Sequence, residues 1–394
     1  MKITVPTIDF GTSKIVTMVA QSNGERCDIV GSGAVPYSGY LQDGWNNPDE
    51  IRDVIRTAID QAQKTGNCRI HELNVGVPGM FTRVIVKEVH VSLTGPDPHV
   101  TAQDVRACFK LAEESGGDRI IHSAPAWFRV DDGKKTLSPV GIKGRELSAM
   151  IALVTADKYF IDDITYRLRD MDIEPREFYS TVAGEATYAL SQDERDKTAM
   201  LIDIGYLCTD VMVMEGDALI FHKCLDIGGG HISADIAEQL NIPFPFVEEK
   251  IKQTYSFNST NQDETYVIPA TEDEPARTVR RDEVTPIIEA KVEEIAEAIN
   301  KALEEGGVKL GKWSNVYLTG GGLILNKGGK DFLAGKLHRI IREAQRTNNK
   351  MISHVFSSAV GLTILVVTTQ EEQKAPEGGA KGLFSRAFRW LMGY

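Results

Sequence analysis

Apolar and polar residues follow the same order at two places in the chain, residues 8–14 and 202–210. Each stretch has an apolar run, an aspartate, a glycine two positions later, small or hydroxyl-bearing residues and then more apolar residues. A short apolar run that is interrupted by Asp and Gly predicts two strands joined by a tight turn. The duplication therefore predicts two similar halves that face each other across a cleft.

Helix and strand patterns alternate along both halves. Apolar residues spaced three and four apart predict helices at residues 49–63, 159–170, 181–190, 232–239 and 284–305. Short apolar runs predict strands at residues 3–5, 15–20, 28–33, 73–77, 219–227 and 315–319, with the second hairpin at 199–213.

Residues 84–164 have a different order of elements. An alternating run from 84 to 93 is followed by a helix over 101–114, with Thr101 as its cap, and then by strands at 120–130 and 148–155. This β-α-β-β order predicts a compact inserted subdomain.

Polar residues 255–282 predict a hairpin and mobile loops. The predicted divisions are 1–83 and 165–200 (first half), 84–164 (insertion), 201–235 (core of the second half), 236–311 (its upper subdomain), 312–368 (core and return helix), 369–381 (linker) and 382–394 (amphipathic segment).

Composition narrows the class of protein. Of 394 residues, 25% are charged and 42% hydrophobic, as in soluble globular proteins. A net charge of −12 argues against a broad nucleic-acid-binding face, which needs clustered cations. The five cysteines form no Cys-x-x-Cys pair, so reduced thiols in a cytosolic protein are expected rather than disulfides or a zinc site. No signal peptide is recognised, and the longest apolar run, 359–367, is shorter than the ~20 residues of a membrane-spanning helix.

The first turn carries groups that suit a phosphate and its metal ion. The backbone N–H groups of Gly11, Thr12 and Ser13 are predicted to cradle phosphate oxygens, and Lys14 adds positive charge. Asp9 is predicted to hold Mg²⁺ through water, because this ion keeps several of its waters. An ordinary hairpin turn is the simpler alternative.

The second turn repeats part of this chemistry. Asp203, Gly205 and Thr209 are kept, and Asp203 is the second predicted metal-holding carboxylate. Tyr206 and Leu207 are larger than the residues that fit best around phosphates. The local argument for binding is therefore weaker here than at the first turn.

Two glycine triplets follow predicted strands, Gly228-Gly229-Gly230 and Gly320-Gly321-Gly322. A glycine turn before a helix suits an anion at the helix N-terminus, or a sugar or base lying against bare backbone. Each triplet alone also fits a tight connection. Ligands of α/β sheets bind at the carboxyl ends of strands, where all four turns are expected.

Three further residues are candidates. Glu185, on the helix before the second Asp strand, can position a water that attacks a γ-phosphate; a solvated helix carboxylate is the alternative. Glu249 and Lys252 are three residues apart on a helix, so they form a surface ion pair or contact a ribose. The eight histidines show no metal-binding spacing.

The last thirteen residues, 382–394, have an amphipathic pattern with aromatic residues on one arc and only basic charges. Such a helix after a polar linker is typical of interfacial membrane binding, with a groove on another protein as the alternative site. The residues predicted to contact the membrane are Leu383, Phe384, Arg386, Phe388, Arg389, Trp390 and Leu391.

The ordered set of both Asp turns, Glu185 and the two glycine triplets resembles the actin-like ATPase superfamily. Other stretches resemble the FtsA family of bacterial cell-division proteins in particular. These are Asn74–Gly79 before the insertion, Pro139–Leu147 within it, Val247–Lys252 as a nucleotide-contacting helix, and the amphipathic tail.

The resemblance implies an α/β fold of two halves around a nucleotide cleft, with an inserted small α/β subdomain of the FtsA type. It implies ATP and Mg²⁺ as cofactors, actin-like filaments of the chain itself, and anionic lipids at the cytoplasmic face of the bacterial cell membrane. The implied partners are FtsZ, whose C-terminal peptide docks on residues 236–311, and other division proteins at the insertion; no nucleic acid is implied.

Two departures from the family pattern matter. Residues 206–208 differ from the usual glycine-rich second phosphate loop, so at most slow ATP hydrolysis is expected, and a divergent FtsA-like paralogue is an alternative. Lys291 stands where many members carry arginine. A PilM-like protein of type IV pilus assembly and a small-molecule kinase of the same superfamily also remain open, although neither accounts for the tail.

Overall fold

The computed structural model describes residues 3–24, 26–41, 44–117, 119–261, 263–270, 275–311, 314–344 and 353–373. These residues form two compact units. Unit 1 is built from the described residues of Met1–Leu201, Met212–His222 and Gln345–Tyr394, and unit 2 from those of Ile202–Val211 and Lys223–Ala344.

Unit 1 contains a five-stranded sheet with the order β10-β6-β1-β2-β3. The predicted first hairpin is β1 and β2, which pair antiparallel with Asp9 opposite Val16, while β6 runs parallel to both β1 and β10. The strands are β1 (Ile3–Phe10), β2 (Lys14–Ser22), β3 (Cys27–Pro36), β6 (Glu72–Val77) and β10 (Glu174–Ser180), and β4 (Tyr40–Leu41) pairs with β5 (Gly44–Trp45) beside them.

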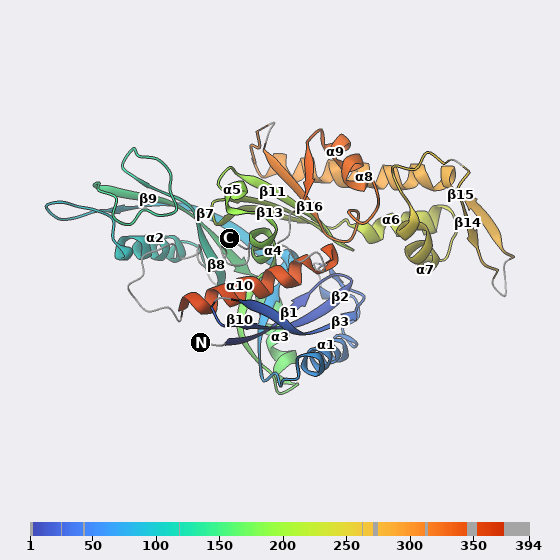
Figure 1. Ribbon diagram of the computed structural model, residues 1–394, viewed down its shortest axis with the longest axis horizontal. Helices are drawn as coiled ribbons and strands as arrows, with labels where there is room; N and C mark the ends of the chain where they lie inside the picture. The colour runs from blue at the N-terminus through green and yellow to red at the C-terminus, as the bar shows by residue number, and fades with distance from the viewer. Residues whose placement is uncertain are drawn as a thin grey trace. The chain divides into compact units, whose positions relative to one another are not determined.

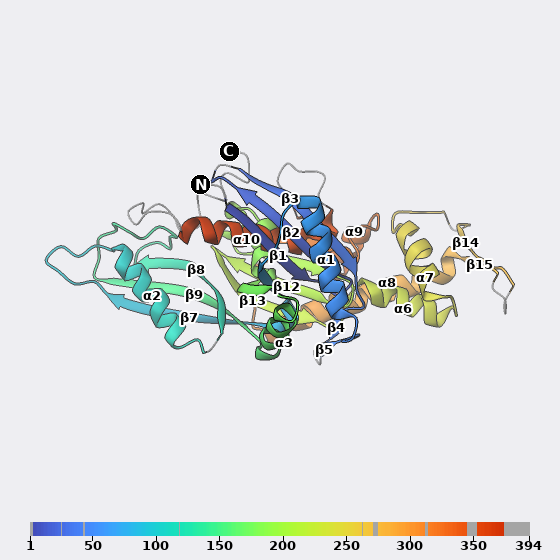
Figure 2. The ribbon, with the colours of Figure 1, turned by 90° about the horizontal axis from the view of Figure 1, so that it is seen from below.

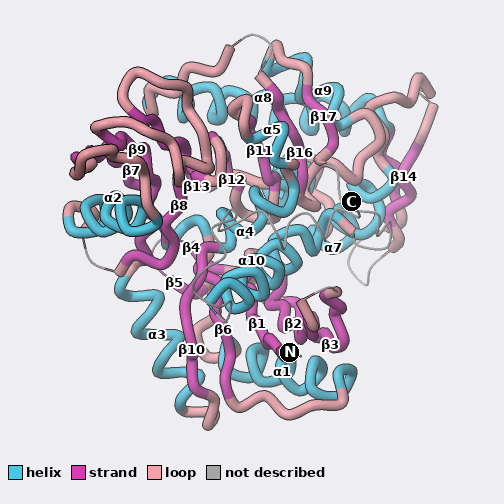
Figure 3. The backbone as a smooth tube through the Cα atoms, turned by 60° about the vertical axis from the view of Figure 1, so that its left-hand side comes forward, coloured by secondary structure: helices cyan, strands magenta, loops and turns pink. Residues whose placement is uncertain are grey.

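Helices cover both faces of this sheet because β1 is apolar on both sides. Ile8 and Phe10 pack with α1 (Ile51–Gly66), η1 (Gly79–Phe81) and α3 (Lys158–Arg169), whereas Val5 packs with α10 (Ser357–Gln373). Figure 3 shows α10 and α1 on opposite sides of the strands. Since side chains alternate along a strand, Thr7 and Asp9 also face α10, and the Thr7 hydroxyl lies 2.7 Å from that of Thr363.

The predicted β-α-β-β insertion is confirmed. Strands β7 (Thr82–Ser92), β8 (Ile120–Val130) and β9 (Glu146–Ala156) form an antiparallel sheet with the order β7-β9-β8. Helix α2 (Ala102–Glu114) covers one face of it (Figure 2), and its predicted cap is present, since Thr101 accepts from the Asp104 backbone N–H.

The second five-stranded sheet has the order β13-β12-β11-β16-β17, and the chain passes between the two units within β11, β12 and β13. A hairpin, β14 and β15, was expected in the polar stretch 255–282 and is present (Figure 1). The strands are β11 (Ala199–Ile204), β12 (Thr209–Glu215), β13 (Ala218–Leu225), β14 (Thr265–Ile268), β15 (Arg277–Arg280), β16 (Asn315–Thr319) and β17 (Ile341–Glu343); the helices of unit 2 are α6 (Gly229–Gln239), α7 (Phe244–Phe246), the π-helical η2 (Val247–Lys252), α8 (Arg281–Glu305) and α9 (Gly329–Leu337).

The sequence patterns missed several elements. Strand β10 was not predicted, because only its last two residues are buried and no alternation is visible. Helix α10 extends to Gln373, so residues 369–373 of the predicted linker are helical; the Gln370 side chain donates to Asn74 of β6. The short elements α5 (Gln192–Arg195), η3 (His354–Phe356), α9 and β17 were also missed.

Within the described ranges, no helix has the length and apolar character needed to cross a bilayer. The amphipathic segment lies outside the described residues. The same holds for its predicted membrane contacts, Leu383, Phe384, Arg386, Phe388, Arg389, Trp390 and Leu391.

Candidate functional site

The two Asp-x-Gly turns are closed by the same backbone hydrogen bond. The Gly11 N–H donates to the Lys14 carbonyl at 3.0 Å, and the Gly205 N–H donates to the Cys208 carbonyl at 2.9 Å. In each case the aspartate is the last residue but one of its strand, Asp9 in β1 and Asp203 in β11. The duplicated pattern therefore encodes two equivalent hairpin turns, one beginning in each unit.

Asp9 is a buried carboxylate, with 6% of its surface exposed. The Ser358 hydroxyl at the start of α10 donates to Asp9 Oδ2 at 3.0 Å. Burial raises the pKa of Asp9 to about 6, against the opposing effects of the Ser358 hydrogen bond and the Lys14 charge. A cation beside Asp9 would restore the charged form, so the residue fits a metal-holding role.

Several backbone groups of the first turn already form hydrogen bonds within the protein. The Gly11 N–H closes the turn, and the Ser13 carbonyl accepts from the Tyr37 N–H at 3.0 Å. Thr12 is buried, and the Lys14 ammonium lies 5.2 Å from the centre of the Phe356 ring. Of the three N–H groups predicted to cradle phosphate, that of Gly11 is therefore already in use.

Glu185 is not a solvated helix carboxylate. It lies on α4 (Thr181–Ala189) with 2% of its surface exposed, where α4 crosses α10. The backbones meet so closely that a Cβ on Gly361 would lie 2.6 Å from the Glu185 Cα. Ser358 and Gly361 are three residues apart on α10, about 4.5 Å along its axis. Asp9 and Glu185 thus approach the same helix about one turn apart, an arrangement that the sequence analysis did not foresee.

In unit 2, three of the predicted turns come together through their backbones. The N–H groups of Gly229, Gly230 and Gly322 donate to the carbonyls of residues 205, 206 and 204 at 2.9, 2.7 and 2.7 Å. A Cβ on Gly320 or Gly322 would overlap the backbone of Ile204 or Gly205. These glycines are required because strand ends pack backbone against backbone.

This packing corrects one prediction. An anion at the N-terminus of α6 was expected to use the amides of the first triplet. The Gly228 N–H donates to His231 Nδ1 at 3.0 Å, and those of Gly229 and Gly230 bind the second turn. The glycine triplet in this structure orders the Asp203 turn instead of offering its amides to an anion.

The predicted surface pair of Glu249 and Lys252 is wrong. Lys252 is 8% exposed and its ammonium donates to the Gly229 carbonyl at 2.6 Å and to Glu248 at 3.2 Å, while Glu249 is exposed. Glu248 and Lys252 are four residues apart, so they lie on the same side of the helix. Burial lowers the pKa of Lys252. Lys252 therefore secures the first glycine triplet to η2.

Two other side chains in unit 2 hold the same region together. The Thr209 hydroxyl, predicted to bind cofactor, donates to the Ile227 carbonyl at 2.7 Å and is fully buried. Asn326, which the sequence analysis missed, donates to the Lys252 and Tyr255 carbonyls at 2.6 and 3.1 Å. An Asn three to four residues beyond a glycine turn was the available signal for it.

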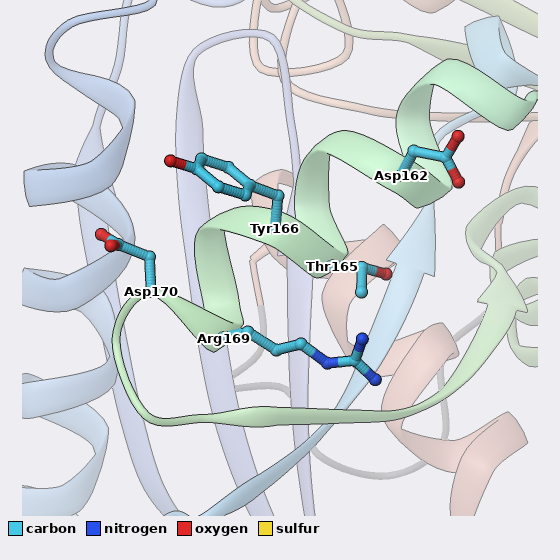
Figure 4. Close-up of a pocket in the computed structure, with 5 residues that line it drawn as sticks. All are labelled: Asp162, Thr165, Tyr166, Arg169 and Asp170. Atoms are coloured by element: carbon cyan, nitrogen blue, oxygen red, sulfur yellow. The ribbon is translucent and has the colours of Figure 1, made fainter.

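A surface hollow on α3 contains none of the predicted site residues. Asp162, Thr165, Tyr166, Arg169 and Asp170 line it, all on α3 or at its end (Figure 4). Two of its charged residues form ion pairs with residues that do not line the hollow. Asp170 pairs with Arg52 at 2.7 Å, and Arg169 pairs with Glu174. This hollow is therefore a poor candidate for the site.

Two family models match the chain. One, described as cell division protein FtsA, covers residues 200–361, and the other, described as the SHS2 domain inserted in FTSA, covers residues 79–155. Together they span more than half of the chain. The cell division protein FtsA of Pseudomonas aeruginosa is 26% identical over 320 residues, 80% of this chain and 76% of that relative. That of Neisseria meningitidis is 22% identical, with 98% of this chain and 97% of the relative covered.

Solved structures show the same fold. The PilM-PilN type IV pilus biogenesis complex has a chain that matches with a TM-score of 0.61 and 17% identity, covering 93% of this chain and 99% of that one. MreB5 of Spiroplasma citri bound to AMPPNP matches with a TM-score of 0.55 and 11% identity, covering 94% and 98%. At these identities the likeness establishes an actin-like α/β fold and nothing beyond it.

Proposed function

This chain belongs to the FtsA family of actin-like ATPases, and we propose from that premise that it binds ATP with Mg²⁺ through its two Asp-x-Gly turns. We further propose that it assembles into filaments at the cytoplasmic face of the bacterial membrane at the division site. There its C-terminal amphipathic segment holds it to anionic lipids, and it tethers FtsZ. The observation that carries ATP binding is the shared hydrogen bond of the two turns, each preceded by an aspartate.

The first turn is proposed to hold the metal and the phosphates. Asp9 would hold Mg²⁺ through water, and the ion would supply positive charge to the phosphates; Asp203 of the second turn is the other proposed metal-holding carboxylate. Thr12, Ser13 and Lys14 contact phosphate oxygens. The hydrogen bond from Ser358 to Asp9 supports this proposal, and the next residue, Ser357, has a buried hydroxyl with no hydrogen-bond partner among the described residues.

Glu185 is proposed to orient the attacking water, because it is buried one helical turn from the contact between Asp9 and α10. The position of Tyr206 supports the expectation of slow ATP hydrolysis at most. A Cβ on Gly230 would lie 3.0 Å from the Tyr206 ring, so the ring covers the start of α6 where a smaller residue would leave room.

The second glycine triplet is proposed to face the sugar and base. Gly320 and Gly322 are buried and Gly321 is partly exposed, so Gly321 is the member available to a ligand. Gly228, Gly229, Gly230, Gly205 and Thr209 act by ordering the turn. Lys252 does the same for η2, which leaves the exposed Glu249 as the ribose contact.

The FtsZ peptide is proposed to dock on residues 236–311. Lys291 lies on α8 in this region and pairs with Asp235 at 2.9 Å and Glu294 at 2.6 Å. The inserted subdomain, 84–164, is proposed to contact other division proteins and neighbouring copies of the chain. The family match supports both proposals.

ATP binding is tested by thermal unfolding of the full chain. MgATP at 100 times its dissociation constant should raise the free energy of unfolding by about 2.7 kcal/mol. Asp203→Asn should reduce this increase, whereas the exposed loop variant Asp132→Asn should not. Equal increases in both variants, or none in the parent chain, would refute the assignment of the turns.

Tethering is tested by flotation of labelled FtsZ with anionic vesicles and MgATP. The full chain is compared with a version that ends at Ala375. We expect FtsZ to float only with the full chain. Flotation of the chain without FtsZ would favour a different partner, such as a pilus component, and no flotation would assign the tail to protein docking.

A further inference from the structure

Three potential metal ligands meet at the end of the second turn although they are scattered in the sequence. The ligand atoms of Cys208, Asp210 and Cys224 all lie within 4.8 Å of one another. Cys208 closes the turn through its carbonyl, Asp210 follows in β12, and Cys224 lies in β13, the neighbouring strand. The absence of a Cys-x-x-Cys pair concealed this cluster, because its members meet only when the two strands pair.

We propose that Cys208, Asp210 and Cys224 bind one Zn²⁺ ion, with water as its fourth ligand. Two thiolates and a carboxylate are ligands that Zn²⁺ accepts, at about 2.3 Å for sulfur and about 2.0–2.2 Å for oxygen. Ligand atoms around a tetrahedral ion at those distances lie less than 4.8 Å apart, so small side-chain rotations complete the site. The two thiol protons leave to solvent as the ion binds.

The burial of the three residues suits an ion held at the protein surface. Cys208 is 8% exposed, and Asp210 and Cys224 are partly exposed, so an ion can reach the ligand atoms from solvent. Three negatively charged ligands and one divalent ion leave a net charge of −1, which a partly solvated site tolerates.

The ligand set separates this site from the proposed Mg²⁺ site. Mg²⁺ prefers oxygen ligands and keeps its waters, whereas thiolates select Zn²⁺. Among the described residues, no cysteine outside this cluster belongs to a group of three potential metal ligands. Cys108, for example, is buried in the apolar core under α2. The inference does not depend on ATP binding.

The test uses the full chain, treated with a chelator, without nucleotide, and Zn²⁺ alone as the probe. We expect one Zn²⁺ per chain by elemental analysis after gel filtration. Co²⁺ in its place should give a thiolate-to-metal charge-transfer absorption band. Cys224→Ser should abolish that band, and Asp210→Asn should weaken Zn²⁺ binding at least about tenfold, since even outer-shell partners of metal ligands contribute that much. The control Cys68→Ser, at a partly buried cysteine in unit 1, should leave the absorption band and the Zn²⁺ affinity unchanged.

Unfolding of the metal-free variants separates ligand loss from misfolding. If Cys224→Ser melts like the parent chain and still binds one Zn²⁺ with the same affinity, the proposal is overturned. The same follows if Cys68→Ser abolishes the Co²⁺ band. If the reduced chain binds no Zn²⁺ and hydrogen peroxide joins Cys208 to Cys224, with loss of two hydrogen atoms and release of two waters, the pair is a redox couple and the metal assignment is wrong.

Discussion

Asp9 lies at the end of a buried strand, where the Ser358 hydroxyl, the charge of Lys14 and a backbone hydrogen bond at Phe10 stabilise its carboxylate. Water is largely excluded there, so the negative charge is costly to the folded protein. Its pKa of about 6, against an ordinary 3.8, expresses that cost. A buried carboxylate that lowers the stability of the folded protein is typical of a site that binds a cation. Strand positions that serve only packing are usually apolar.

Asp9→Asn should stabilise the nucleotide-free protein at pH 8. A raised pKa means that the protonated carboxyl is favoured in the folded state, so its stabilising effect is complete below about pH 4 and lost as the pH rises through 6. Removing the charge should raise the free energy of unfolding at pH 8 by up to about 3 kcal/mol and much less at pH 4.5. Denaturant unfolding at the two pH values measures this difference. The exposed Asp132→Asn is the control, and a similar response in both variants would count against the burial cost.

At the scale of elements, the α4–α10 crossing positions the first half of the site. Gly184 and Gly361 let the two helix backbones touch, with the Cβ of any larger residue 2.6–3.0 Å from the facing backbone. The same crossing buries Glu185, and α10 brings Ser358 to Asp9. Even a small displacement of α10 would therefore change the surroundings of both carboxylates, Asp9 and Glu185.

Gly361→Ala should destabilise the protein by about 1–3 kcal/mol, because the added methyl group has no space and overpacking costs about that much. Gly335→Ala on α9 is a matched control, since nothing lies within 4 Å of its Cβ. That change should be stabilising by about 0.5–1 kcal/mol, as Ala favours a helix interior. Urea unfolding of both variants tests the pair, and equal effects would show that the crossing is not tight in solution.

For the whole molecule, charge is unevenly distributed along the chain. The net charge is −12, yet the charged residues of segment 382–394 are only basic, Arg386 and Arg389. An acidic protein is repelled by anionic lipids, so the proposed membrane binding requires a segment with the opposite charge and with apolar surface to bury.

Replacing both arginines with alanine should weaken binding to anionic vesicles about 30-fold, since each cation contributes about 1 kcal/mol near such a surface and about 1.4 kcal/mol is tenfold. Binding to neutral vesicles should change little. Trp390→Ala should weaken binding to both kinds, because it removes apolar surface. Sedimentation with vesicles of each composition gives the affinities, and an unchanged affinity for anionic vesicles in the arginine variant would exclude an electrostatic contribution.

Local geometry could be predicted from the amino-acid order alone. A turn is made by residues within four positions of one another, so the two Asp-x-Gly motifs predicted the same hydrogen-bonded hairpin at residues 11–14 and 205–208. The β-α-β-β insertion and the Thr101 cap followed from periodicity and local side-chain chemistry for the same reason.

The groups that meet across the fold could not be predicted in this way. The burial of Lys252 depended on its contact with the Gly229 carbonyl, and the use of the Gly229 and Gly230 amides depended on a turn more than twenty residues earlier. Cys208 and Cys224 came together through strand pairing. The burial of Glu185 depended on α10, from the far end of the chain. Such contacts arise from the packing of distant segments, which no local pattern records.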